Sequence, residues 1–427
     1  MASLLQRRFL PIVFVAALTL RLGAAGALRA WEDPVTWENG SIARALVAGH
    51  GFSFDYGEGA ISRYFTSPRP EPTSFQAPFY PYLLAAFYLL GRHVGNDAAL
   101  MLLLLLQAAV GAALVVPAYH LARRLFDHRA AAVSAGIAAV YPAFIYAATV
   151  LHQAVWCITG FAVAFLGLLS LRERPSVWRA ALYGALLGLL LLVEPVFLGL
   201  AAAAWLGVIL VGRERGRLAG TGAVAVAAAL VVAAPWLVRC YVVHGHFVFV
   251  KSCSGFNLWQ GNNPASRGSW RTGFTHVNYA GLPELQRRLR QADGEWERDA
   301  IWRAAALQEM KSAPARTAVH FVEKAVAFWT ITLRHGLTAN PCYWVPYGLL
   351  LVPALGTMIA LRKRPQDYLP ALMAFAAATL VYSTTFTGPR YRMPLEPLLF
   401  VFSAQGIVLV GARLAAWRRR VTRPAGV

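Results

Sequence analysis

Long apolar runs, repeated along most of the 427 residues, are the feature that most constrains how this chain folds. Runs of about 18 or more apolar residues have the length that an α-helix needs to cross the hydrocarbon layer of a membrane. Because the runs are continuous rather than alternating, they predict helices and exclude a β-barrel. Only 14% of the residues are charged, against about 25% in soluble domains. We therefore expect an all-α polytopic membrane protein.

About ten membrane-spanning helices are predicted, and the pattern is compatible with 10–13. They cover residues 9–28, 98–119, 130–149, 154–171, 180–193, 196–211, 218–238, 345–361, 368–386 and 398–415. Two further apolar stretches, 79–93 and 319–333, are short or interrupted by charge, so we expect them at the membrane edge. Whether either one spans the membrane is left open.

The predicted spans divide the chain into three parts. Residues 1–238 form an N-terminal transmembrane module, which includes a first exterior loop over 29–97. Residues 239–343 form a second exterior segment, and residues 344–427 form the C-terminal transmembrane helices. Within the second segment, the glycine- and asparagine-rich part up to Trp270 is typical of an ordered loop. The polar stretch 283–310 has helical spacing instead.

Basic clusters mark one side of the membrane. All six predicted inner boundaries carry arginine or lysine, as the positive-inside rule expects. Of the 20 acidic residues, four fall on this side: Asp127, Glu173, Glu214 and Asp367. The basic residues behind the net charge of +20 are therefore expected to set the orientation of the chain in the membrane. We expect no nucleic acid as a partner. Contact with phosphate or anionic lipid stays open. Both termini are expected in the cytoplasm, with the chemistry on the exterior face.

The first exterior loop holds a group of six acids: Glu32, Asp33, Glu38, Asp55, Glu58 and Glu71. A carboxylate at the edge of a bilayer is costly unless water, a partner or a substrate meets it. Glu38 would lie in the first turn of a helix that begins near Thr36, where the helix dipole favours an acid. Such a group suits a general base or a divalent metal ligand. The sequence leaves both roles open, beside the plainer reading of a solvent-exposed helix start.

Other polar residues at predicted outer boundaries are candidates for binding a substrate. These candidates are Glu32, His152, Gln153, Glu194, Asn262, Asn263 and Tyr391. Arg390 and Arg392 lie on the outer side, against the general trend of the arginines, and a guanidinium matches the geometry of a phosphate. Lys251 is a third candidate for the same phosphate. The structural alternatives are an interfacial histidine, a tight asparagine turn and arginines that anchor the chain at the interface.

Several stretches, in this order, resemble the glycosyltransferase C superfamily, and in particular bacterial proteins of glycosyltransferase family 39, the protein-mannosyltransferase-like and aminoarabinose-transferase-like group. Two of them are WENGSIARALVAGHGFS and PTSFQAPFYPYLLAAFYLLG in the first exterior loop. The others are YPAFIYAATVLHQA, PWLVRCYVVHGHFVFVKSCSGFNLWQGNNPASRG, KAVAFW and GPRYRMPLEPLL. Each stretch is degenerate alone, but together they run through nearly the whole chain.

The resemblance implies a glycosyltransferase C-type fold in a bacterial inner membrane. It implies transfer of a hexose or pentose from a polyprenyl-phosphate donor to an acceptor hydroxyl on a protein, lipid or polysaccharide, with inversion. An acid of the first loop would be the base, with Glu38 first and Asp33 second. Val35 and Thr36 stand where many members have an Asp-Glu pair. Gln153 stands where the subgroup has an acid, and an amide is neither a base nor a strong metal ligand.

A transporter or flippase is the main alternative, since polar residues and broken helices also line transport pathways. Three features favour a transferase. The acids cluster in an exterior loop rather than at the membrane midplane, a long exterior segment interrupts the spans, and the sequence has no evident inverted repeat. A non-catalytic protein that binds a polyprenyl lipid is a third alternative, which Gln153 keeps open. The sequence does not specify the sugar, the polyprenyl chain, the acceptor or a need for metal.

Overall fold

The computed structural model describes residues 2–54, 70–212, 214–264, 266, 282–330, 340–362, 364, 366 and 368–421. Of the acids named above, Asp55, Glu58 and Asp367 lie outside these residues. The helices of the N-terminal module are α1 (Ala2–Ala27), α2 (Trp37–Val47), α3 (Phe79–Val94), α4 (Asn96–Ala113), α5 (Val115–Leu125), α6 (His128–Val140), α7 (Pro142–Ala147), α8 (Ala154–Glu173), α9 (Val177–Val193), α10 (Val196–Val211) and α11 (Arg215–His244). Two short strands, β1 (Ser53–Phe54) and β2 (Glu71–Pro72), pair antiparallel in the first exterior loop.

The remaining helices follow the end of α11. They are α12 (Ser254–Asn262), α13 (Pro283–Gln291), α14 (Gly294–Ser312), α15 (Pro314–Trp329), α16 (Pro341–Ala360), α17 (Leu369–Thr384), α18 (Pro389–Arg392), the 3₁₀ turn η3 (Met393–Leu395) and α19 (Glu396–Val421). The helix predicted over 283–310 is therefore confirmed as α13 and α14. The loop predicted up to Trp270 is wrong in part, because α11 continues to His244 and α12 forms a further helix. Gly245, in the left-handed conformation with φ 65°, ends α11.

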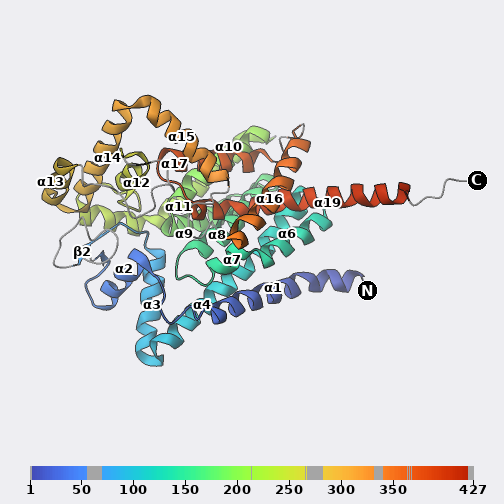
Figure 1. Ribbon diagram of the computed structural model, residues 1–427, viewed down its shortest axis with the longest axis horizontal. Coiled ribbons are helices and arrows are strands. Elements are labelled where there is room, and N and C mark those ends of the chain that lie inside the picture. The colour runs from blue at the N-terminus through green and yellow to red at the C-terminus, as the bar shows by residue number, and fades with distance from the viewer. Residues whose placement is uncertain are drawn as a thin grey trace, which may run out of the picture.

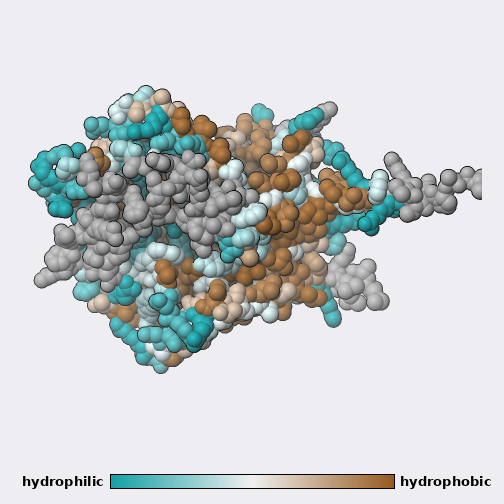
Figure 2. Space-filling view, in the orientation of Figure 1, coloured by the Kyte–Doolittle hydropathy of each residue, from teal (hydrophilic) through white to brown (hydrophobic). Residues whose placement is uncertain are grey.

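The molecule is elongated, and its two ends differ in character. The start of α1 and the end of α19 lie at one end, which we call the terminal end, while α2, β2, α13 and α14 lie at the other, which we call the loop end (Figure 1). Figure 2 shows a hydrophobic surface between the two ends and a hydrophilic surface over much of the loop end. This distribution is the one expected of a protein that crosses a membrane along its long axis.

Every predicted span corresponds to a helix or to two consecutive helices. Six helical segments are long and apolar enough to cross a membrane: Arg8–Ala27, Asn96–Leu125, Ala154–Glu173, Arg215–His244, Pro341–Ala360 and Pro389–Arg419. Three shorter apolar helices, α9, α10 and α17, lie among them. Helices suit this environment because hydrocarbon offers the backbone no hydrogen-bond partner, so each segment must satisfy its own amides. The chain is a multi-pass membrane protein with an all-helical transmembrane region.

Small residues let the spans approach closely. A Cβ added to Gly184 of α9 would lie 2.1 Å from the carbonyl oxygen of Ala225 in α11. A Cβ on Gly188, one turn further along α9, would lie 2.7 Å from the carbonyl oxygen of Ala229. Glycines four residues apart form a flat stripe on which another helix backbone can pack, as in other membrane helices. Helix α9 is thus held firmly against α11, and Glu194 follows directly at its end.

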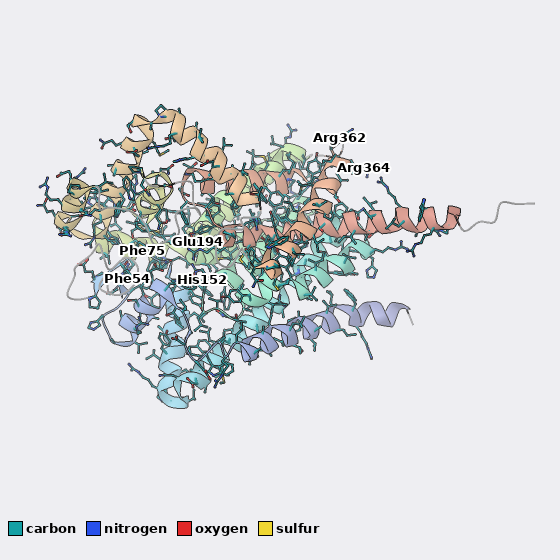
Figure 3. All side chains as sticks on the ribbon, viewed as in Figure 1. Phe54, Phe75, His152, Glu194, Arg362 and Arg364 are labelled. Atoms are coloured by element: carbon teal, nitrogen blue, oxygen red, sulfur yellow. The ribbon has the colours of Figure 1, made fainter. Side chains whose placement is uncertain are left out.

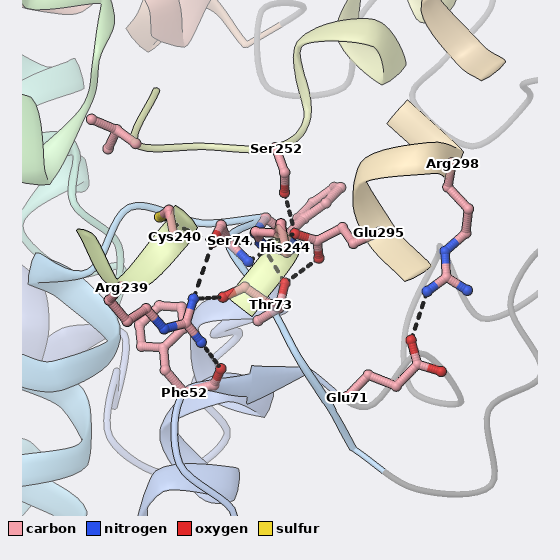
Figure 4. A network of polar contacts seen from close by, with 12 residues as sticks. Phe52, Glu71, Thr73, Ser74, Arg239, Cys240, His244, Ser252, Glu295 and Arg298 are labelled. Carbon is pink, nitrogen blue, oxygen red and sulfur yellow. Dashed lines mark hydrogen bonds and ion pairs between the residues drawn. The ribbon is translucent and has the colours of Figure 1, made fainter. Parts of the chain in front are cut away.

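At the loop end, a buried carboxylate joins the first exterior loop to α14 (Figure 4). Glu295 accepts a hydrogen bond from the backbone amide of Ser74 at 2.8 Å, and others from the hydroxyls of Thr73 and Ser252. Its residue exposure is only 7%. A buried charge of this kind is tolerated because several donors replace the water that it has lost.

Two arginines extend this network. Arg239 of α11 donates to the carbonyl oxygen of Phe52 at 2.8 Å and to the hydroxyl of Ser74 at 3.0 Å. Arg298 of α14 pairs with Glu71 of β2 at 2.6 Å (Figure 4). These contacts fasten β2, and Phe52 directly before β1, to helices more than 150 residues away in the sequence. The acid group of the first loop therefore includes one structural residue, Glu71.

We expect Glu295→Gln to lower the free energy of unfolding by about 1–3 kcal/mol, because the amide keeps one acceptor oxygen and places a donor NH2 where the second carboxylate oxygen accepted a hydrogen bond. The melting temperature of the full chain in detergent, followed by tryptophan fluorescence, measures this change. Glu323→Gln removes an exposed carboxylate from α15 and serves as the control, with an expected change below about 0.5 kcal/mol. Equal melting temperatures for both variants would contradict the proposed stabilising role.

Candidate active site

Glu38 lies where the sequence predicts it, in the first turn of α2. The buried face of this helix includes Ile42, Ala43 and Ala45. Ile42 packs in a cluster with Phe52 of the first loop and Trp236 of α11. Glu38 itself is partly exposed. The packing of α2 thus holds the carboxylate at the surface of the loop end while its neighbours anchor the helix.

Arg390, near the C-terminal end of the sequence, lies close to acids from the N-terminal half. The carboxylates of Glu38 and Glu194 are both close enough for their charges to act on its guanidinium. The guanidinium also donates to the hydroxyl of Tyr391 at 3.0 Å and lies 4.9 Å from the centre of that ring. Tyr391 in turn stacks on Tyr382 of α17, with 4.8 Å between the ring centres. Arg390 is exposed at the surface of this group.

Lys251 and Glu194 form an ion pair beside Arg390. The ammonium of Lys251 lies 3.4 Å from a carboxylate oxygen of Glu194. Burial alone lowers the pKa of Lys251, but the attraction of Glu194 outweighs it and the net direction is upward. Lys251 therefore remains protonated. The site holds two cations, from segments that are far apart in the sequence, next to two carboxylates.

His152 faces the same group of charges. Burial, together with the positive charges of Arg390 and Lys251, lowers the pKa of His152 to about 3. Its ring meets the edge of Trp37 in α2 at 5.5 Å, and its Nδ1 accepts from the backbone amide of Ala154 at 3.2 Å. Figure 3 shows His152 and Glu194 near each other, far from Arg362 and Arg364 at the terminal end. The imidazole is neutral at physiological pH.

Gln153 is joined to α2 by an amide pair. The side-chain amide of Asn39 donates to the side-chain oxygen of Gln153 at 3.1 Å, and both residues are buried. Asn39 directly follows Glu38, so the pair links the candidate base to the turn between α7 and α8. The position where the resembling subgroup has an acid is therefore neutral here and is engaged in a contact that also orients α2.

Backbone strain occurs next to two of these charged residues. Trp37, directly before Glu38, has φ 44°, and Val250, directly before Lys251, has φ 65°. Left-handed conformations are costly for residues with a Cβ, above all for a β-branched one. Residues in such conformations cluster at functional sites, where the surrounding structure enforces them. Arg29, outside this group, has the third such conformation among the described residues, with φ 47°, so the strain accompanies Glu38 and Lys251 but is not confined to them.

Arg392 requires a correction to its predicted role in binding a phosphate. Its Nε lies 2.9 Å from a carboxylate oxygen of Glu396, its Nη1 donates to the carbonyl oxygen of Phe328 at 2.7 Å, and its guanidinium lies 3.5 Å from the ring centre of Tyr347. The residue is only 2% exposed. Arg392 is thus occupied inside the protein and does not face the group formed by Arg390 and Lys251.

The two asparagines predicted to bind a substrate are also engaged internally. Asn262 donates to the carbonyl oxygens of Leu258 and Thr384, at 2.8 and 2.9 Å, and accepts from the ammonium of Lys324 at 3.1 Å. Asn263 donates to the carbonyl oxygen of Trp259 at 3.0 Å. These contacts end α12 and fasten it to α15 and α17. Both asparagines therefore belong to the scaffold, which is the structural alternative considered above.

Glu32 and Asp33 lie at the surface. Glu32 is exposed and pairs with Arg29 three residues earlier. Asp33 is also exposed. Neither carboxylate is among the charges that act on Arg390 or His152. Among the acids at the start of the first loop, Glu38 is the one that joins the group of Arg390, Lys251 and His152.

Three residues near this group were not predicted from the sequence to belong to the site. Trp37 and Asn39 flank Glu38 and contact His152 and Gln153, respectively. Tyr382 lies within an apolar span and supports Tyr391. A buried tyrosine in a span is ordinary by composition, so Tyr382 gave no signal. The positions of Trp37 and Asn39 beside an acid at a helix start were the available signal.

A divalent metal ion, which the sequence left open, finds no donor set here. Among the residues that the structure describes, no three His, Cys, Asp or Glu side chains converge so that they could hold a metal ion. The charged group that acts with the Glu38 carboxylate is the cation Arg390, and the predicted second acid position holds the neutral Gln153. Hard divalent cations prefer several anionic oxygens. We therefore derive no step that passes through a metal ion.

Comparison with known proteins supports the architecture. Residues 75–238, less than half of the chain, match the family model described as dolichyl-phosphate-mannose-protein mannosyltransferase. The archaeal oligosaccharyltransferase AglB from Archaeoglobus fulgidus, in complex with an inhibitory peptide and a dolichol-phosphate, aligns with a TM-score of 0.57 and 16% identity. The alignment covers 98% of this chain and 52% of that one. The chain has the glycosyltransferase C fold.

Two further structures complete the comparison. The apo form of the same archaeal oligosaccharyltransferase aligns with a TM-score of 0.56 and 16% identity, over 96% of this chain and 51% of that one. ArnT from Cupriavidus metallidurans bound to undecaprenyl phosphate aligns at 0.44 and 16% identity, over 100% and 82%. No curated protein matches the sequence. The chain spans about half the length of the oligosaccharyltransferase, and Glu38 lies outside the matched residues 75–238.

Proposed function

We propose that this protein is a glycosyltransferase that moves a sugar from a polyprenyl-phosphate donor to an acceptor hydroxyl at the loop end. The observation that carries the proposal is the position of Arg390, an exposed cation close to Glu38 and Glu194 on a glycosyltransferase C fold. A transfer of this kind needs a base for the acceptor and a cation for the phosphate that leaves, and this arrangement supplies both.

In the proposed step, the Glu38 carboxylate removes the proton from the acceptor hydroxyl. The acceptor oxygen then bonds to the anomeric carbon of the sugar from the face opposite to the phosphate. The bond between that carbon and the phosphate oxygen breaks, and polyprenyl phosphate leaves with the electron pair. Glu38 ends the step protonated, and the configuration at the anomeric carbon is inverted.

Arg390 and Lys251 would stabilise the negative charge that grows on the leaving phosphate. The guanidinium of Arg390 offers several N–H donors in one plane, which fits two phosphate oxygens at once. Lys251 adds a second charge, and its ion pair with Glu194 keeps it protonated and in place. Because both cations are fixed before the reaction begins, they need little reorganisation as the charge develops.

Neutral groups would complete the sugar site. The buried amide pair of Asn39 and Gln153 would support this site from behind, because it fixes α2 and with it Glu38. His152 is neutral, so it adds no third cation. Because its Nδ1 accepts from the backbone amide of Ala154, its proton is on Nε2, which can donate a hydrogen bond. Tyr391 lies beside Arg390 and offers a ring face for the sugar or the acceptor. The donor and acceptor are defined only by chemical class.

The distribution of the arginines supports the proposed topology. We place the terminal end in the cytoplasm, since the basic clusters lie at the inner boundaries, and the loop end on the exterior face of a bacterial inner membrane. Polyprenyl phosphate is a membrane lipid, so its phosphate would reach the loop end from the outer leaflet. The acceptor hydroxyl would approach from the aqueous side.

Arg390→Gln is expected to raise the donor concentration required for half-maximal rate by at least about tenfold, because hydrogen bonds to charged groups contribute about 1.5–3 kcal/mol. Kinetics of the purified protein in detergent, with polyprenyl-phosphate sugar as the varied substrate, measure this effect. Arg288→Gln, an exposed arginine on α13, is the matched control. If Arg390→Gln left both the donor requirement and the maximal rate unchanged, this arginine would be reduced to an interface anchor.

The function itself is tested by the fate of the donor lipid. Mass spectrometry of membranes from cells that lack the protein should reveal an accumulated polyprenyl-phosphate sugar, and this also identifies the sugar. The same lipid, extracted and mixed with the purified full chain and envelope extract as acceptor, should release free polyprenyl phosphate. A flippase would leave the bond between sugar and phosphate intact, so the absence of released polyprenyl phosphate would overturn the proposal.

A further inference from the structure

A second site candidate lies at the terminal end, away from the proposed active site. It is a pocket of about 610 Å³ between α5, α8 and α9. This volume is within the range of small-molecule sites, about 300–1,000 Å³. Arg124 of α5, Arg174 after α8 and Arg179 of α9 line its polar part. The proposed transfer reaction uses none of these residues.

The polar part of the pocket carries an excess of positive charge. Three guanidinium groups line it against one carboxylate, that of Glu173. Arg124 already lies 3.7 Å from Glu173 and donates to the hydroxyl of Ser170 at 2.8 Å. Arg174 and Arg179 are exposed, and the guanidinium of Arg179 donates to the backbone oxygen of Arg174 at 3.5 Å. The pocket therefore favours an anion.

The remainder of the pocket is apolar and opens between two spans. Val163 of α8 and Leu182 of α9 line it and are 39% and 53% exposed, respectively. Gly167 lies between them, and a Cβ there would stand 3.2 Å from the ring of Tyr183. The absence of a side chain at Gly167 lets α8 and the Tyr183 ring of α9 pack closely where both line the apolar groove of this pocket. Its occupant must combine an anionic head with an apolar tail.

The level of the pocket in the membrane is marked by an aromatic residue. Trp178, between Arg174 and Arg179 in the sequence, is 70% exposed. Tryptophan concentrates at the head-group level of bilayers. The three arginines thus lie where phosphate groups of the leaflet on this side are located, and the groove extends from them toward the hydrocarbon.

We propose that this pocket binds an anionic phospholipid of the leaflet at the terminal end. Its phosphodiester contacts Arg174 and Arg179, with Arg124 behind them, and one acyl chain lies in the groove past Gly167. Basic pockets between membrane helices bind anionic lipid head groups in this way. The pocket lies between two helices that border the proposed active site: α8 begins directly after Gln153, and α9 ends directly before Glu194. A lipid bound here therefore stabilises the position of α8 relative to α9.

Native mass spectrometry of the full chain, released from detergent in the presence of phosphatidylglycerol or phosphatidylcholine, tests the proposal. We expect phosphatidylglycerol to bind preferentially, and the double variant Arg174→Gln/Arg179→Gln to lose about tenfold in affinity for it. Arg362→Gln/Arg364→Gln removes the same charge at the same end of the molecule, outside the pocket (Figure 3). This control is expected to bind phosphatidylglycerol as the unmodified protein does.

Two outcomes would overturn the proposal. Equal losses in both double variants would mean that phosphatidylglycerol responds to the overall charge of this end rather than to the pocket. Complete displacement of the lipid by millimolar inorganic phosphate would mean that the arginines form a phosphate site without a lipid-specific groove. Circular dichroism and melting temperatures of both variants establish that they are folded, so a loss of binding is not a loss of structure.

Discussion

Replacing Glu38 with glutamine is expected to abolish sugar transfer while the protein remains folded and abundant. Glutamine keeps the shape of the side chain but cannot take the proton from an acceptor hydroxyl. General-base catalysis contributes roughly 10²–10⁴-fold to a rate. The rate of sugar transfer should therefore fall by that factor. The loss should appear in the maximal rate rather than in the donor requirement, because the phosphate contacts of Arg390 and Lys251 remain.

The chain offers closely matched controls for this experiment. Asp33→Asn and Glu32→Gln neutralise exposed carboxylates of the same loop, five and six residues before Glu38. Both variants should retain nearly full activity. Release of free polyprenyl phosphate from the donor lipid is the measurement in all three cases. If Glu38→Gln were fully active and Asp33→Asn inactive, the base would be Asp33 and the arrangement around Arg390 would need another explanation.

The spans were predictable because the length and apolar character of each run alone determine that it forms a helix. A run long enough to cross hydrocarbon must be helical wherever it lies in the chain, so no knowledge of its neighbours is needed. The helix at Glu38 was predictable for a similar local reason, since an acid in the first turn and a following apolar face both lie within α2. Local rules thus accounted for most of the fold.

The choice among the acids was not predictable, because it depends on contacts across the chain. Glu38 differs from Asp33 in being close to Arg390, which enters the site from the far end of the sequence. The buried role of Glu295 depends likewise on Thr73, Ser74 and Ser252, none of which is near it in sequence. No spacing within one segment reports such neighbours.

The helix α12 was missed for a different reason. Its sequence, SGFNLWQGN, is rich in glycine and asparagine, which favour turns and loops. The structure overrides this preference by burying Gly255 and Trp259 against α14. A Cβ on Gly255 would lie 2.0 Å from the carbonyl oxygen of Asp299, so the glycine is there for close packing rather than for a turn.

The pair Arg390 and Arg392 contains a signal that was readable in the sequence. Residues two apart on a helix point about 200° apart, so the two arginines of a short helical turn face opposite directions. Glu396 stands four residues after Arg392, the spacing at which helical side chains meet. The sequence RMPLE therefore indicated that Arg392 has an internal partner, whereas Arg390 does not have an acid at that spacing.

Arg392→Met is accordingly expected to destabilise the protein strongly, by about 3–5 kcal/mol, because it leaves the Glu396 carboxylate buried without its cation. Both residues are at most 2% exposed, so solvent cannot replace the lost partner. The melting temperature of the full chain in detergent is the measurement. Arg390→Met, two residues away, should leave the melting temperature nearly unchanged and lower the rate of sugar transfer instead.

The double variant Arg392→Met/Glu396→Met separates a buried ion pair from simple packing. Removing both charges leaves no unpaired group, and apolar replacements for buried pairs are often neutral or stabilising. We therefore expect the double variant to recover most of the melting temperature lost by Arg392→Met. A double variant as unstable as the single one would place the contribution of Arg392 in its contacts with Phe328 and Tyr347. In either case, a large loss of stability on substitution of Arg392 would assign it to the scaffold. A large loss of activity on substitution of Arg390 would assign that residue to the active site.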